Sequence, residues 1–137
     1  MKTIGYLGLG VMGYGMTSNL IDKSGTTIYG YDPVPALRER FAQRGGKALE
    51  TGQELYETCD IIFMCLPTNA IVKATITEIL ETAKPGTTLV DMGSTSPYVI
   101  QELHAAAVEK GFYLLDSPVS GGETGANGGT LVIMCGG

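Results

Sequence analysis

Short apolar runs alternate along this chain with longer segments in which apolar residues recur at helical spacing. This alternation is typical of repeated βαβ units and predicts a parallel sheet, because consecutive parallel strands need a crossover that returns the chain to the same end of the sheet. The predicted fold is α/β, a doubly wound, mainly parallel sheet with helices on both faces. We expect strands at 3–8, 26–31, 47–49, 60–66, 87–91, 112–115 and 130–135. Helices are expected over 33–44, 68–83 and 97–110, and around Met12, Met16 and Leu20, which recur every fourth residue on one face turned toward the sheet.

Length and composition predict one domain over residues 1–137, because 44% hydrophobic residues can form a core. The net charge of −5 comes without a basic stripe, which argues against nucleic acid or an anionic membrane as a partner. The chain runs from Met1 directly into the first apolar run. Cys59, Cys65 and Cys135 form no CxxC pair, and buried free thiols are typical of a reducing compartment. We therefore expect a soluble, cytoplasmic protein without a metal site.

A GxGxxG pattern stands where the first apolar run ends and a helical pattern begins. Its glycines allow a tight strand-to-helix turn, close approach of backbone to a pyrophosphate, and close packing of helix on strand. The free N–H groups of the helix N-terminus then face the phosphates. A merely glycine-rich turn is the alternative, but an acid ends the second apolar run, where it can accept hydrogen bonds from an adenosine ribose. The predicted dinucleotide site is Gly8, Leu9, Gly10, Val11, Met12, Gly13 and Asp32.

Asp32 also predicts NAD in preference to NADP, because a carboxylate accepts from a free 2′-hydroxyl and repels a 2′-phosphate. Arg38, in the following helical segment, keeps NADP possible.

Two other segments follow strands at the edge where a doubly wound sheet binds ligands. Leu66, Pro67 and Thr68 come after the fourth strand, where an ordinary strand-ending turn is the alternative interpretation. Ser94 and Thr95 come after the fifth strand and are candidates for contact with the cofactor. The next pair, Ser96-Pro97, is typical of a helix start, with serine as N-cap and proline at the first helical position.

Residues 116–131 contain five glycines within nine residues and lie between two predicted strands. A hairpin needs far less chain than this, and long structured loops are usually functional. We expect a long loop whose backbone N–H groups form a concavity for an anion. A flexible linker is the alternative.

The two glycine-rich segments together resemble the β-hydroxyacid dehydrogenase family, which includes 3-hydroxyisobutyrate dehydrogenase, tartronate semialdehyde reductase and, more distantly, 6-phosphogluconate dehydrogenase. The resemblance spans essentially the whole chain. It rests on Gly8-Leu9-Gly10-Val11-Met12-Gly13, Met16, Asn19-Leu20, Asp116-Ser117-Pro118-Val119-Ser120-Gly121-Gly122, Gly125-Ala126 and Gly129-Thr130-Leu131.

The resemblance implies reversible hydride transfer between NAD and a small β-hydroxyacid or its semialdehyde. Ser120, Gly121 and Gly122 would hold the substrate carboxylate, while Leu66, Pro67 and the Ser94 region would line the cofactor. Backbone N–H groups suit a carboxylate, and an apolar wall suits a nicotinamide face. The family usually has adjacent serine and threonine after the fifth strand. Alignment on Pro97 gives Gly93-Ser94 and a shift by one residue gives Ser94-Thr95, so the hydroxyl that meets the cofactor is open.

In the family, an all-helical second domain supplies a lysine as general acid/base, and no residue here matches it. Lys110 and His104 fall in or beside a predicted helix, where a surface position is the simpler interpretation. We therefore expect an isolated cofactor domain, inactive alone, whose full-length enzyme forms a homo-oligomer through the second domain.

Two alternatives differ from this interpretation. A 6-phosphogluconate dehydrogenase-like enzyme is disfavoured by Asp32, where the resemblance would suggest an asparagine-arginine pair, and by Thr130-Leu131 in place of proline-serine. A non-catalytic module that senses dinucleotides is disfavoured because it has no use for the Ser120-Gly121-Gly122 segment.

Overall fold

The computed structural model describes residues 1–137 and contains a six-stranded sheet in which every pairing is parallel. Its strand order is β3-β2-β1-β4-β5-β6. The chain builds outward from β1 to β3 and then returns to place β4 beside β1, so the order of the strands reverses between β1 and β4. The strands are β1 (Ile4–Leu7), β2 (Ile28–Tyr31), β3 (Lys47–Ala48), β4 (Ile61–Met64), β5 (Thr88–Asp91) and β6 (Tyr113–Asp116).

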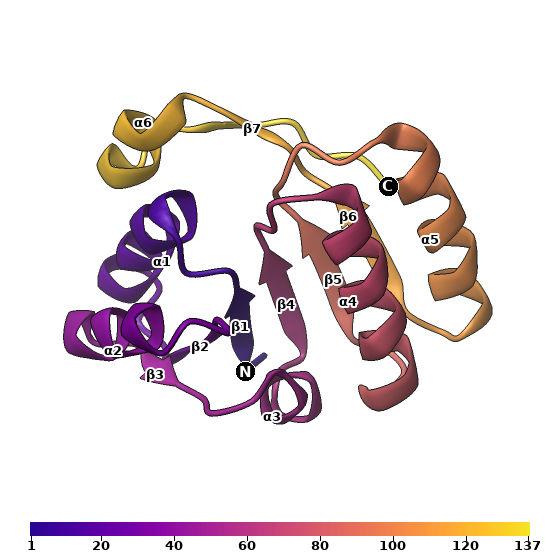
Figure 1. The fold of residues 1–137 in the computed structure, drawn as a ribbon, viewed down its shortest axis with the longest axis horizontal. Coiled ribbons are helices and arrows are strands. Elements are labelled where there is room, and N and C mark those ends of the chain that lie inside the picture. Colours follow the sequence, from indigo (N-terminus) through magenta and orange to yellow (C-terminus); the bar gives the residue numbers. More distant parts are fainter.

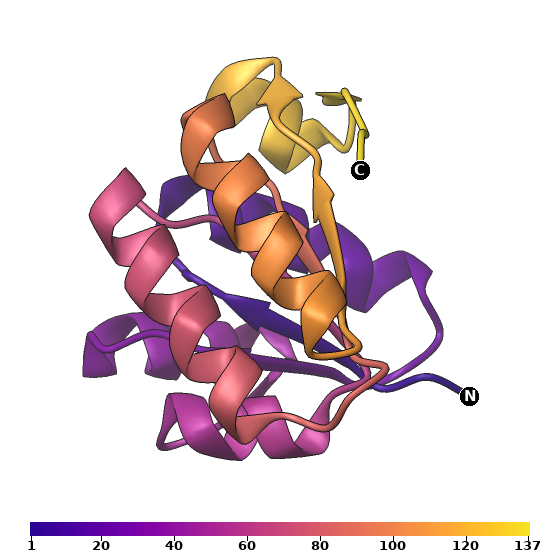
Figure 2. The ribbon, with the colours of Figure 1, turned by 90° about the vertical axis from the view of Figure 1, so that its right-hand side faces the viewer.

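Helices cover both faces of this sheet, as Figure 1 shows with α1 and α2 on one side and α4 and α5 on the other. In Figure 2, α4 and α5 lie side by side in front of the strands. The predicted fold class is confirmed, and most predicted boundaries are correct within two residues. The helices of this layer arrangement are α1 (Val11–Lys23), α2 (Pro35–Arg44), α3 (Gly52–Thr58), α4 (Asn69–Thr82) and α5 (Pro97–Glu109).

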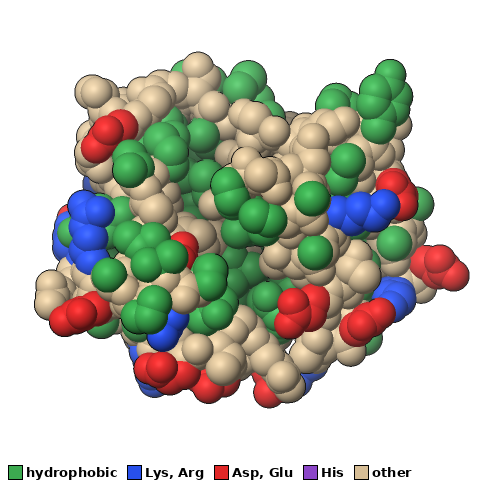
Figure 3. All heavy atoms as spheres, viewed as in Figure 1, with side chains coloured by type: hydrophobic (Ala, Val, Ile, Leu, Met, Phe, Trp, Pro, Cys, Tyr) green, Lys and Arg blue, Asp and Glu red, His purple; other side chains and the backbone are tan.

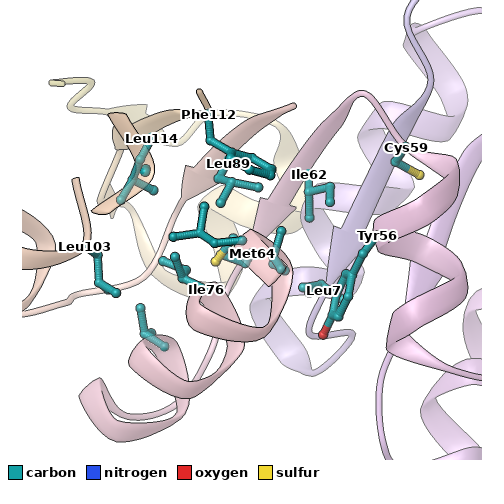
Figure 4. Packing of buried hydrophobic residues seen from close by; sticks show 14 of the residues in the cluster. Leu7, Tyr56, Cys59, Ile62, Met64, Ile76, Leu89, Leu103, Phe112 and Leu114 are labelled. Carbon is teal, nitrogen blue, oxygen red and sulfur yellow. The ribbon is translucent and has the colours of Figure 1, made fainter. Parts of the chain in front are cut away.

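The core lies in two clusters, one on each face of the sheet, because successive side chains of a strand point to opposite faces. Along β4, Ile62 and Met64 belong to the larger cluster under α4 and α5, whereas Phe63 packs against the cluster under α1. Figure 4 shows Ile62, Met64, Leu89 and Ile76 packed together in the larger cluster. Met16 is buried in the smaller cluster, and Met12 and Leu20 pack against it, so their predicted orientation toward the sheet is confirmed.

The short helix α3 was absent from the sequence prediction. Its N-cap is Thr51, whose hydroxyl accepts a hydrogen bond from the backbone N–H of Glu54 at 3.2 Å. A threonine followed three residues later by glutamate is a capping-box signal, so the sequence did contain the information. Leu55 and Tyr56 anchor this helix in the larger cluster.

The glycine-rich segment is more ordered than predicted, and the expectation of a long loop is wrong. The predicted long loop contains the strand β7 (Val119–Ser120) and the helix α6 (Gly122–Gly128). The predicted strand at 130–135 shrinks to β8 (Val132–Ile133), which pairs antiparallel with β7 in a separate two-stranded sheet. Tertiary contact explains the helix, because Gly125 and Ala126 are buried and α6 lies against α1 (Figure 1).

Candidate functional site

A cleft of about 680 Å³ opens beside the carboxyl ends of β1, β2 and β4, next to the reversal of strand order. In open α/β sheets this position is the usual ligand site. Figure 3 shows hydrophobic side chains gathered in a hollow in the middle of the molecule. Of the residues predicted for the cofactor, the cleft lining includes Gly8, Gly10, Val11, Met12, Gly13, Asp32, Leu66 and Pro67.

Other lining residues were not predicted as part of the site. Tyr31, Pro33, Val34 and Leu37 flank Asp32 and form the wall next to α2, and their closeness to Asp32 in sequence could have identified them. Tyr56, Ile71, Thr75 and Glu78 come from α3 and α4, and no local signal places them here.

Each glycine of the fingerprint has a different structural reason. A Cβ at Gly8, where φ is +90°, would overlap the backbone carbonyl of Cys65 on the neighbouring strand end. A Cβ at Gly13 would overlap the carbonyl oxygen of Gly8, so these two glycines let the turn and the helix pack closely. A Cβ at Gly10 would meet nothing within 4 Å, and its φ of −68° is open to any residue. Packing therefore does not require glycine at position 10, which lines the open cleft.

The first turn of α1 has unpaired backbone donors. The N–H groups of Gly10, Val11, Met12 and Gly13 donate no hydrogen bond within the chain, and the first helical bond is that from Tyr14 to the carbonyl of Gly10 at 2.7 Å. Val11 is exposed. Unpaired N–H groups at the start of a thirteen-residue helix attract an anion, because the helix dipole adds to their partial positive charge.

Asp32 fastens this turn to the end of β2. One carboxylate oxygen accepts from the N–H of Leu9 at 2.9 Å, and the other accepts from the N–H of Val34 at 2.9 Å. The side chain of Leu9 is fully buried, so Leu9 contributes only its backbone to the site. A carboxylate offers about four lone-pair positions, so Asp32 can still accept from a ligand hydroxyl in the cleft.

The guanidinium of Arg38 is directed at the backbone beside Asp32. It donates to the carbonyl of Asp32 at 2.9 Å and lies 5.7 Å from the ring centre of Tyr31. Glu50, 3.8 Å away, is its partner in an ion pair. Arg38 is the cation that keeps NADP possible in the sequence analysis, and its guanidinium is thus already held by contacts within the chain.

The segments after β4 and β5 lie next to each other. A Cβ at Gly93 would lie 3.4 Å from the carbonyl oxygen of Leu66, and the N–H of Ser96 donates to the side chain of Asn69 at 2.9 Å. Thr68 is the N-cap of α4, with its hydroxyl accepting from the N–H of Ile71, and it is not part of the cleft lining. Pro97 stands at the first turn of α5 as predicted, but the side chain of the Ser96 N-cap makes no capping hydrogen bond.

Thr95 and Ser94 differ in their environment. The hydroxyl of Thr95 donates to the carboxylate of Asp91 at 2.5 Å, and the N–H of Gly93 donates to the other oxygen of Asp91 at 3.0 Å. Ser94 is exposed and forms no side-chain hydrogen bond within the chain. Neither hydroxyl belongs to the cleft lining.

Asp91 and Asp116 form an acidic pair at the ends of β5 and β6, where they are direct neighbours in the sheet. Burial raises the pKa of Asp91, and burial together with the charge of Asp91 raises the pKa of Asp116. One oxygen of Asp116 is buried without a hydrogen-bond partner. The pKa of the Cys65 thiol is also raised, first by burial and then by Asp91, so Cys65 is a protonated thiol at neutral pH.

Ser120, Gly121 and Gly122 lie at the junction of β7 and α6, outside the lining of the cleft. Gly121 and Gly122 have φ values of +136° and +59°, and their N–H groups donate no hydrogen bond within the chain. All three residues are exposed. The structure therefore presents them on the surface, with unpaired donors that can meet an anion.

His104 and Lys110 do not approach either segment through any hydrogen bond. His104 is half-buried on α5, and Lys110 is the exposed C-cap of that helix, as expected for surface positions. All three cysteines are free, but Cys135 is exposed and Cys65 only half-buried, so only Cys59 is a fully buried thiol as predicted.

Comparison with known proteins identifies the family of this chain. The sequence profile of the NAD binding domain of 6-phosphogluconate dehydrogenase matches residues 3–137. The chain belongs to this family. The chain is thus an NAD-binding domain, and the predicted resemblance is confirmed.

Hydroxyacid dehydrogenases are among the proteins to which this NAD-binding domain is similar. A 2-(hydroxymethyl)glutarate dehydrogenase of Eubacterium barkeri is 41% identical over 97% of this chain and 45% of its own length. A probable 3-hydroxyisobutyrate dehydrogenase of Mycobacterium tuberculosis is 37% identical over 100% of this chain and 46% of its own length. The chain thus spans about half the length of the curated relatives it matches.

A solved structure extends the comparison to three dimensions. The 3-hydroxyisobutyrate dehydrogenase of Mycobacterium tuberculosis with L-serine matches with a TM-score of 0.94 at 37% identity, over 100% of this chain and 47% of that chain.

No helix of this NAD-binding domain is long and apolar enough to cross a membrane.

Proposed function

We propose that this chain binds NAD(H) in the cleft between β1, β2 and β4 and presents it for hydride exchange with a small β-hydroxyacid. The observation that carries the proposal is the open space at Gly10. A Cβ at this position would meet no atom within 4 Å, so packing does not require a glycine there, and Gly10 lines the cleft. Four unpaired N–H groups stand at this point, which suits a pyrophosphate. Bound NAD supplies the hydride acceptor, while the chain's own residues bind and orient it.

NAD is preferred over NADP in this proposal. Asp32 keeps lone pairs for ribose hydroxyls and carries the charge that repels a 2′-phosphate, while Arg38 is engaged by backbone carbonyls and Glu50. Calorimetric titration of the chain with both cofactors tests this preference. We expect tighter binding of NAD and a smaller difference in Asp32→Ala. Equal or tighter binding of NADP by the unaltered chain would refute the preference.

Ser94, rather than Thr95, is the proposed hydroxyl contact with the cofactor. The hydroxyl hydrogen of Thr95 is already donated to Asp91, whereas Ser94 is exposed and uncommitted. Leu66 and Pro67 form the apolar wall on that side of the cleft. In the same titration, we expect Ser94→Ala to weaken NAD binding more than Thr95→Val does. The reverse order would assign the contact to Thr95.

The carboxylate of the substrate is proposed to bind at Ser120, Gly121 and Gly122. Their support is the pair of unpaired N–H groups at Gly121 and Gly122 and the exposed position of all three residues. L-Serine, present in the related mycobacterial structure, is a β-hydroxy carboxylate of the proposed class. No residue of the chain matches the general acid/base lysine that the resemblance implies, and His104 and Lys110 lie on α5 and at its C-cap, so we propose that the 137 residues alone do not turn over.

Formation of NADH from 3-hydroxyisobutyrate, glycerate or L-serine by the purified chain tests this last proposal. We expect no turnover above background. Turnover that disappears in Lys110→Ala or His104→Ala would show that the chain holds its own proton acceptor.

A cytoplasmic location, suggested by the three free cysteines, belongs to the same proposal.

A further inference from the structure

Helix α6 has little of its own to hold it in place. Three of its seven residues, Gly122, Gly125 and Gly128, are glycines, and only Gly125 and Ala126 are buried. Glycine costs helix stability at each position, and helices this short are not stable in isolation. The position of α6 must therefore come from its neighbours.

Apolar packing provides only part of that support. A hollow of about 450 Å³ lies between α1, α6 and the sheet, and Met16, Leu20, Phe63, Met92 and Leu131 line it. Ala126 belongs to the smaller core cluster, but this unfilled space interrupts the packing between α6 and the sheet. The direct support of α6 is α1.

The side chain of Asn19 on α1 makes the polar part of this contact. Its amide nitrogen donates to the carbonyls of Ala126 at 2.9 Å and Asn127 at 3.2 Å, both on α6, and to the carbonyl of Gly15 at 3.1 Å on its own helix. The carbonyls at the C-terminal end of a short helix otherwise lack partners. Asn19 thus satisfies acceptors of α6 while joining the two helices.

Gly15 lets the helices approach closely enough for this contact. A Cβ at Gly15 would lie 2.8 Å from the carbonyl carbon of Ala126 and 2.9 Å from the nitrogen of Asn127. Backbone of α6 therefore lies directly on backbone of α1, within reach of the Asn19 amide.

The other end of α6 carries the turn proposed to hold the substrate carboxylate. The N–H of Gly125 donates to the carbonyl of Gly121 at 3.0 Å, and the side chain of Leu131 packs beside Gly121 and Gly125. A displacement of α6 therefore moves Gly121 and Gly122. The N-terminus of α1, in turn, is the proposed pyrophosphate site.

We propose that Asn19 is a positioning residue that sets the substrate turn at Ser120–Gly122 relative to the cofactor end of α1. One rigid helix then carries the dinucleotide contact at Gly10 and, two turns further on, the attachment of the substrate segment. The positioning of the substrate rests on the proposed function, whereas the attachment of α6 to α1 does not.

The test compares Asn19→Asp with Asp22→Asn in the 137-residue chain. Asn19→Asp preserves size and removes the donors that α6 needs. Asp22→Asn is the matched exchange on the same helix, at an exposed residue that pairs with Arg44 of α2 rather than with α6. Asn19→Ala, which deletes the donors without adding charge, is the second variant if the first does not fold.

Amide hydrogen exchange read by NMR decides the attachment. In Asn19→Asp we expect the N–H groups of Gly125 and Ala126 to exchange about tenfold faster or more, because the net stabilisation of one or two hydrogen bonds is lost. Exchange in the sheet and NAD affinity should change less than twofold, and Asp22→Asn should leave α6 unchanged. Unaltered exchange in α6, or equal acceleration throughout the chain, would overturn the proposal.

Titration with 3-hydroxyisobutyrate in the presence of NAD separates the two proposals. In the unaltered chain we expect the amide signals of Ser120, Gly121 and Gly122 to shift, and Asn19→Asp to require a higher ligand concentration for the same shift at unchanged NAD affinity. No shift in the unaltered chain would refute the carboxylate site, and the attachment of α6 would then be decided by the exchange data. A full shift at unchanged concentration in Asn19→Asp would overturn the positioning role.

Discussion

Replacing Gly10 with valine should abolish cofactor binding without harming the fold. The backbone at Gly10 has φ −68° and ψ −160°, an extended conformation that β-branched residues adopt readily. Its Cβ would meet no atom within 4 Å, so the new side chain would extend into the open space at the cleft that Gly10 lines. We expect the free energy of unfolding to fall by no more than about 1 kcal/mol, because Gly10 is the N-cap of α1, where valine is less favourable than glycine.

The effect on binding is much larger. The valine would occupy the space in front of the unpaired N–H groups of residues 10–13 and keep a pyrophosphate away from them. A hydrogen bond to a charged group contributes about 1.5–3 kcal/mol, so the loss of two such bonds costs about 3–6 kcal/mol. The dissociation constant for NAD should therefore rise by about two to four orders of magnitude.

Isothermal calorimetry with NAD and urea unfolding followed by circular dichroism measure the two quantities separately. Gly13→Ala is the matched control, because its Cβ would overlap the carbonyl oxygen of Gly8 and should destabilise the fold by about 1–3 kcal/mol. If Gly10→Val bound NAD within threefold of the unaltered chain, the pyrophosphate could not lie at this turn. If it unfolded as easily as Gly13→Ala, packing rather than the ligand would explain the glycine.

Other substitutions test the pair Asp91 and Asp116, the packing of Phe41 in the core, and helix α3, which was absent from the sequence prediction. Because the folded pKa of Asp116 is raised above the ordinary 3.8, the folded chain holds this proton more tightly than the unfolded chain, and stability falls as pH rises through that window. Asp116→Asn should raise Tm by a few degrees at pH 7 and by less at pH 4, and an equal change at both pH values would contradict this cause. Gly46→Ala should cost about 1–3 kcal/mol in urea unfolding, because its Cβ would overlap the fully buried ring of Phe41, and a neutral effect would show that the ring can move. Thr51→Ala should cost about 1 kcal/mol in the same assay through loss of the α3 cap, and Thr51→Ser should restore most of it.

Local chemistry in the sequence was sufficient to predict the sheet and several of the residues that line the cleft of the proposed cofactor site. The strand-helix alternation predicts the layers, because parallel strands require crossovers, and Gly8, Gly13 and Asp32 identify the turn through backbone needs that few other residues meet. Parallel strands end at the same edge, so segments distant in sequence, such as Asp32 and Leu66, were expected to share one cleft, and they do.

Contacts between distant segments determined the rest. Nothing local indicates that the segment with Gly122, Gly125 and Gly128 is helical, since glycine disfavours helix. This segment forms α6 in contact with α1, where Gly15 leaves room for its backbone and the Asn19 amide donates to its carbonyls. Likewise, Ser94 and Thr95 are equivalent candidates by residue type, and only the position of Asp91 on β5 engages one of the two hydroxyls. Hydrogen bonds and close packing depend on positions in space within a few tenths of an ångström, and such positions arise only once the whole sheet and its helices are assembled.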